Sequence, residues 1–193
     1  MKPALAGKRA CVVALVIALG GCISLQPVNY RPRYANYNLL AGQSLCAAAI
    51  GKTSVASPSL NEIGLRGATL VSPVENSFGA FVGSALEEEL GHAGLYDSAS
   101  TRRIDVALTE NRIDPSTGTG MGRMAATFTV SSAGSDPVFS KSVDARREWP
   151  SSFFGVTAVD QARIQHGQLV ADLLHKLFQD PAFIDALRCP ARG

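Results

Sequence analysis

Apolar residues recur with helical spacing in two stretches of the chain. In residues 78–93, and again in residues 158–178, they fall on one face of a helix at intervals of three and four positions. Gly94 follows the first stretch, where glycine commonly ends a helix. After the second stretch, Pro181 opens a shorter helix that ends at Leu187. The pattern predicts two long helices, each with an apolar face that another element must cover.

Strict alternation of apolar and polar residues marks three strands that follow one another as a meander, over residues 104–113, 123–131 and 138–149. Two further apolar runs, residues 45–55 and 66–71, are candidate strands earlier in the chain. The resulting order β-α-β-β-β-α predicts an α+β two-layer sandwich. In this fold a mainly antiparallel sheet carries the two long helices on one face.

The first 21 residues have the pattern of a signal peptide. Three basic side chains, Lys2, Lys8 and Arg9, precede an apolar run over residues 10–19. This run is shorter than the roughly 20 apolar residues that a helix needs to cross a bilayer. We expect the segment to be removed on export.

The apolar run ends in Leu19-Gly20-Gly21-Cys22, which resembles the lipobox of bacterial lipoproteins. The resemblance implies cleavage before Cys22 and attachment of lipid to its sulfur and its new amine, and two or more acyl chains give lasting membrane attachment. An uncleaved signal anchor and a chance cysteine are the alternatives. Because Ile23 follows rather than aspartate, the rule for lipoprotein sorting favours the outer membrane, facing the periplasm; inner-membrane and surface-exposed placements stay open.

Removal of the signal peptide changes the charge of the protein. The full chain has 18 basic and 16 acidic residues, and three of the basic residues lie in the signal peptide, so the remainder has a formal charge of −1. A protein with this balance lacks the basic surface that nucleic acids require, and we expect no nucleic acid partner.

The rest of the chain divides into a tether and one domain. Residues 22–43 contain Pro27 and Pro32 and no amphipathic period, so they are predicted to form a flexible tether with a reach on the order of 25 Å. Residues 44–189 have the length of a single domain with its own core.

The cysteines predict a disulfide. Cys11 leaves with the signal peptide and Cys22 is lipidated, which leaves Cys46 and Cys189 as a pair in an oxidising compartment. A bond between them would join the two ends of the domain. Two buried free thiols are the alternative.

The remaining polar residues give no pattern typical of catalysis. His92, His166 and His175 lack the spacing of metal ligands, and we expect them at the surface or at helix ends. The glycine-rich stretch 118–122 joins two strands instead of opening a helix, so it predicts a hairpin loop rather than a phosphate site. The acidic run 87–89 is expected to be a solvated helix face. We therefore expect a protein that is not an enzyme and holds no metal or cofactor.

An aromatic segment stands between the last predicted strand and the second long helix. It contains Trp149, Phe153, Phe154 and Val156, in a chain that otherwise uses aromatic residues sparingly. Buried, these side chains would close the end of the core; exposed, they would form a contact patch for a protein partner or lipid. We expect Trp149 and Phe153 in the core and Phe154 in the patch.

Several short motifs carry a resemblance to known proteins. They are Leu70-Val71-Ser72-Pro73, Ser77-Phe78 with Leu86, Leu90 and Ala93-Gly94, Thr117-Gly118-x-Gly120, Trp149-x-Ser151-Ser152-Phe153, and Leu173 with Asp180-Pro181-x-Phe183-Ile184. With them, the chain from Cys46 to Leu187 resembles a family of bacterial envelope lipoproteins similar to YajG-like proteins and to accessory lipoproteins of ABC-type transport and LPS assembly.

The resemblance implies a lipid-anchored accessory or binding component in cell-envelope assembly or transport, with an envelope protein or a lipid as its partner. A structural or surface lipoprotein without a transport role is the alternative, and an unrecognised hydrolase is a further one. The shared motifs are structural, so the resemblance implies the fold more directly than the function.

Overall fold

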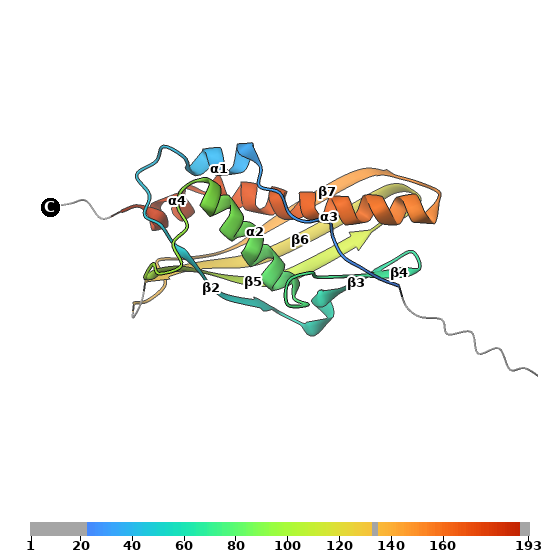
Figure 1. Cartoon of the computed structure of the whole chain (residues 1–193), viewed down its shortest axis with the longest axis horizontal. Coiled ribbons are helices and arrows are strands. Elements are labelled where there is room, and N and C mark those ends of the chain that lie inside the picture. Colours follow the sequence, from blue (N-terminus) through green and yellow to red (C-terminus); the bar gives the residue numbers. More distant parts are fainter. Residues whose placement is uncertain (1–22, 133–134, 190–193) are drawn as a thin grey trace, which may run out of the picture.

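The computed structural model describes residues 23–132 and 135–189, and its elements are arranged in layers (Figure 1). In chain order they are β1 (Ile23–Leu25), α1 (Tyr34–Leu40), β2 (Ala49–Val55), the 3-10 helix η1 (Pro58–Asn61), β3 (Glu62–Leu65), β4 (Ala68–Val71), α2 (Phe78–His92), β5 (Arg102–Asp114), β6 (Gly118–Ser132), β7 (Phe139–Ser151), α3 (Gly155–Phe178) and α4 (Pro181–Leu187).

The main layer is a four-stranded sheet in the order β2-β5-β6-β7. Strands β5, β6 and β7 form the predicted antiparallel meander, whereas β2 lies parallel to β5. Helices α2 and α3 lie together on one face of this sheet (Figure 1). The predicted α+β class, with two long helices on one side of a mainly antiparallel sheet, is confirmed.

The core lies between the helices and the sheet. The apolar stripe of α2 contributes Phe78 and Leu86, and that of α3 contributes Leu173, all fully buried. They meet the inward side chains of the sheet, such as Leu108 and Phe128, which are also fully buried. Burial of large apolar side chains at this level is the main favourable term in the folding free energy.

The glycine-rich stretch differs from the predicted hairpin loop, because β6 already begins at Gly118. Gly120 pairs with Trp149 across β6 and β7, and a Cβ at Gly120 would lie 2.3 Å from the indole ring. The glycine leaves room for the tryptophan to lie flat on the sheet and close the core.

The predicted tether is instead part of the fold. Strand β1 pairs in parallel with β4, which also pairs with β3 in a second, three-stranded sheet. Helix α1 packs on α2 and α3, and Tyr30 and Leu40 are buried. The prediction of a flexible segment is therefore wrong for residues 23–40, because these side chains find buried partners that lie far away in the sequence.

The two ends of the domain are joined at one place. Cys46 and Cys189 form the predicted disulfide, with their Cα atoms 5.0 Å apart. The backbone reinforces it, because Cys46 N donates to Leu187 O at 2.8 Å and Leu45 pairs with Arg188 as an isolated bridge.

Candidate functional site

The aromatic segment forms an exposed corner between β7 and α3. Phe153, Phe154 and Val156 are 74%, 73% and 80% exposed, and the two phenylalanine rings pack edge to face at 6.1 Å. Trp149 is buried, as predicted, whereas the expectation that Phe153 lies in the core is wrong. The difference arises because the sheet ends at Ser151, so side chains beyond it have no core to enter. We call Phe153, Phe154 and Val156 the aromatic corner.

Hydrogen bonds hold the backbone of the aromatic corner in place. The guanidinium of Arg66, in the turn between β3 and β4, donates to the carbonyl oxygens of Ser152 and Phe153 at 3.0 and 2.9 Å. Within the corner, Phe154 N donates to the hydroxyl of Ser152 at 3.1 Å. The exposed side chains therefore project from a fixed support.

The described chain begins at the same end of the molecule as the aromatic corner. Ile23, which is 60% exposed, pairs with Ala68, two residues from Arg66. Further along, the carbonyl oxygen of Gln26 accepts a hydrogen bond from Nε of Arg163 in α3 at 2.6 Å. Figure 1 shows β4, the start of the described chain and the β7–α3 turn together at one end. Cys22 precedes Ile23 directly in the sequence and lies outside the described residues.

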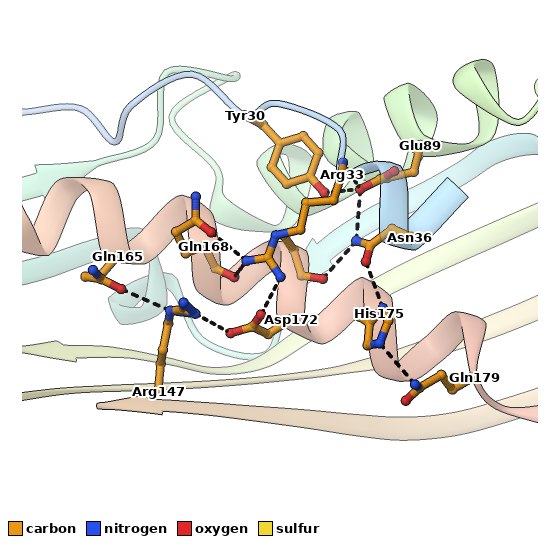
Figure 2. A network of polar contacts seen from close by, with 11 residues as sticks. Tyr30, Arg33, Asn36, Glu89, Arg147, Gln165, Gln168, Asp172, His175 and Gln179 are labelled. Carbon is orange, nitrogen blue, oxygen red and sulfur yellow. Dashed lines mark hydrogen bonds and ion pairs between the residues drawn. The ribbon is translucent and has the colours of Figure 1, made fainter. Parts of the chain in front are cut away.

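A polar network fastens the N-terminal segment to the helices (Figure 2). At its centre is Glu89 of α2, which is fully buried. Its Oε1 accepts hydrogen bonds from Tyr30 Oη at 2.5 Å, from Asn36 Nδ2 at 2.9 Å and from Arg33 N at 3.1 Å. Burial and this hydrogen bond raise the pKa of Tyr30 above its usual value. The expectation of a solvated acidic run is thus wrong for Glu89.

The network continues across α3 to the sheet. Arg33 and Arg147 both pair with the carboxylate of Asp172, at 2.6 and 2.9 Å. The side-chain oxygen of Asn36 also accepts a hydrogen bond from Nδ1 of His175 at 2.9 Å. One acidic residue thus links the N-terminal segment, α3 and β7. These contacts serve to fasten the segment.

Replacing Glu89 with alanine is expected to lower the free energy of unfolding by about 3 kcal/mol, because three donors lose one charged acceptor. Urea denaturation would measure the loss, and limited proteolysis would report release of the N-terminal segment. Glu88→Ala is the matched control, since Glu88 is the exposed neighbour in the same helix. Equal effects of the two substitutions would contradict a fastening role for Glu89.

His166 is fully buried, in contrast to the surface or helix-end position expected for it. Its Nε2 lies 3.1 Å from Asn111 Oδ1, and its ring packs against those of Phe78 and Phe81. Burial lowers the pKa of His166 from 6.5 to about 3, which keeps the ring neutral. The other two histidines agree with the expectation: His92 is the last residue of α2, and His175 lies in the last turn of α3.

The outer face of the sheet carries an open hollow of about 210 Å³ lined by Glu110, Arg112, Asp114, Met121 and Arg123. It contains charges of both signs and no histidine or nucleophile. Within residues 23–132 and 135–189, no three side chains of the metal-ligating types gather in one place. No helix in the described part of the chain combines the length and apolar character needed to cross a bilayer.

Comparison with known proteins finds structural similarity. No family model and no curated protein matches the chain. Protein XCC0632 from Xanthomonas campestris, a DUF330 protein, is 14% identical with a TM-score of 0.54, and the match covers 80% of this chain and 94% of that protein. A protein from Caulobacter crescentus CB15 is 20% identical over 57% of this chain and 87% of its own, with a TM-score of 0.42.

A minor lipoprotein from Acinetobacter baumannii is 13% identical with a TM-score of 0.45, and the match covers 76% of this chain and 97% of that protein. At sequence identities this low, the similarity is informative about the fold alone. The shared fold is established for the Xanthomonas protein, whose TM-score exceeds 0.5.

Proposed function

We propose that this protein is a lipid-anchored lipoprotein of the outer membrane that faces the periplasm and acts by binding, as an accessory component of envelope assembly or transport. The observation that carries the proposal is the aromatic corner. Three large apolar side chains, each more than 70% exposed, stand on a hydrogen-bonded support. Exposed apolar clusters of this kind mark contact surfaces in soluble domains.

The anchor on Cys22 supports the same proposal from the sequence. A short apolar run leads to Leu19-Gly20-Gly21-Cys22, and the protein that follows has an even pair of cysteines joined in a disulfide. Disulfides persist in exported proteins, which agrees with a periplasmic location.

A binding role without catalysis fits the polar groups better than a hydrolase does. The buried polar cluster around Glu89 fastens the N-terminal segment, and the buried histidine faces Asn111 and two aromatic rings. Neither places a nucleophile beside a base in an accessible pocket, which is the arrangement of hydrolases that act through a covalent intermediate.

The anchor is tested by replacing Cys22 with serine. We expect the variant to lose incorporation of radioactive palmitate and to accumulate as the uncleaved precursor, because the thiol that receives the lipid is absent. Wild-type protein labelled in parallel is the reference. Palmitate in the Cys22→Ser variant would overturn the proposed anchor.

The contact role is tested by placing a photo-crosslinking amino acid at Phe154 in cells. Crosslinks to envelope protein or lipid at position 154, and none at the equally apolar Val138 at the other end of the sheet, are the expected result. Absence of any crosslink at position 154 would contradict a contact surface.

A further inference from the structure

We infer that the aromatic corner inserts into the lipid bilayer to which Cys22 is anchored, so that the domain stands directly on the membrane in one fixed orientation. The inference rests on the proposed lipid anchor and names the occupant of the same surface. It follows from where the chain begins, from the side chains present there and from the state of their backbone.

The short distance between the anchor and the folded domain supports this orientation. A tether would let the domain move freely above the membrane, but residues 23–40 are packed onto the domain through β1, α1 and the Glu89 network. One peptide unit, about 3.8 Å between Cα atoms, therefore separates Cys22 from a residue that already pairs in a sheet. The end of the domain that carries Ile23 must lie at the membrane surface.

The side chains at that end are the second argument. The aromatic corner lies there, with Ile23 also exposed. Arg66 connects the two features, because it lies two residues before Ala68 of β4, which pairs with Ile23, and its guanidinium binds the backbone of the corner. The transfer of apolar side chains from water to the interface between headgroups and acyl chains is favourable. An anchor placed beside them brings them within reach of that interface.

The backbone of the corner is the third argument. Carbonyl groups that enter the apolar part of a bilayer without a hydrogen-bond partner are strongly unfavourable. In the aromatic corner, Arg66 already satisfies the carbonyl oxygens of Ser152 and Phe153. The same guanidinium adds a cation at the depth of the lipid phosphates, and the nearby carboxylate of Asp160 is paired with Arg163 at 3.3 Å.

In this orientation, the end of the molecule opposite the aromatic corner faces the periplasm. Gly118 and Ser151 pair at the membrane end of β6 and β7, and Val130 and Phe139 pair at the other end. Strand β7 runs from one end to the other with its thirteen residues, a length of about 40 Å. The disulfide and α4 would therefore point away from the membrane, where an envelope partner can reach them.

The experiment uses the lipidated mature protein in vesicles of phosphatidylethanolamine and phosphatidylglycerol. Val156→Cys and, separately, Phe154→Cys are labelled with an environment-sensitive fluorophore, and vesicles with and without nitroxide-labelled lipid are compared. Val138→Cys is the matched control, since Val138 is 62% exposed at the far end of the sheet. The fluorescence of positions 154 and 156 should be quenched by the nitroxide lipid, and that of position 138 should not.

Two results would overturn the inference, and they differ from a failure of the anchor. If the protein floats with the vesicles but positions 154 and 156 are quenched no more than position 138, the bilayer is not the occupant of the corner. If those positions are shielded by a second copy or by an added envelope protein, a protein is the occupant. If the protein does not float with the vesicles at all, the lipid anchor itself is wrong.

Discussion

Opening the Cys46–Cys189 disulfide is expected to lower the free energy of unfolding by about 4–5 kcal/mol. The bond closes a loop with a sequence separation of 143 residues. A crosslink lowers the conformational entropy of the unfolded chain, and this effect rises with the logarithm of the loop length. It also holds the pairing of Leu45 with Arg188, which brings the beginning and the end of the domain together. The loss in free energy of unfolding is therefore expected to exceed the loss caused by removing one methylene group from the core.

Urea denaturation of a Cys46→Ala, Cys189→Ser variant would measure this loss against the wild type. Reductant added to the wild type should produce the same shift in midpoint, and reductant added to the variant should produce none. A loss below about 1 kcal/mol would mean that the reduced chain keeps its ends together without the bond.

The periodic parts of the chain could be predicted from the sequence because one face of each element is buried. The stripe from Phe78 to Leu90 and the alternation around Val106 and Phe128 reflect burial directly, and the structure places these side chains in the core. The parallel pairing of β2 with β5 could not be predicted in the same way. It depends on which edge of the meander is free after α2 has crossed the sheet, and short apolar runs carry no information on this point.

The N-terminal segment departs most from the sequence-based expectation, and one signal for its packing is present in the sequence. Glu89 follows Ala85 by four positions and Leu86 by three, which puts its carboxylate on the apolar stripe of α2. An acidic residue on a buried face needs donors. Those donors are Tyr30, Arg33 and Asn36, spaced by three residues in a segment without an apolar period. The spacing of the donors becomes meaningful only once the buried acceptor is recognised.

The candidate site could be located from the sequence, but its composition could not. The concentration of aromatic residues after the last strand pointed to the β7–α3 corner. Whether each ring is buried depends on where the sheet ends, and strand boundaries are the least certain part of such predictions. Trp149 lies inside that boundary and Phe153 outside it.

Acidification is expected to destabilise the protein through His166. The pKa of the His166 ring is about 3 in the folded protein, where the ring is buried, and about 6.5 in the unfolded chain. The stabilising contribution is therefore fully present above pH 6.5 and is lost as the pH falls from 6.5 towards 3. Over that whole range it amounts to about 5 kcal/mol, of which about 2 kcal/mol is lost between pH 7 and pH 5.

Urea midpoints at pH 7 and pH 5 would test this expectation with two variants. His166→Gln removes the titrating group and keeps a polar side chain beside Asn111, so its free energy of unfolding should fall by about 2 kcal/mol less than that of the wild type over the same interval. His92→Gln should follow the wild type, because His92 is exposed. If His166→Gln and the wild type lose equal stability on acidification, the protonated ring must find water or an acceptor in the core. The two aromatic rings around it would then have to move apart, since Asn111 offers its oxygen to only one of the two ring nitrogens.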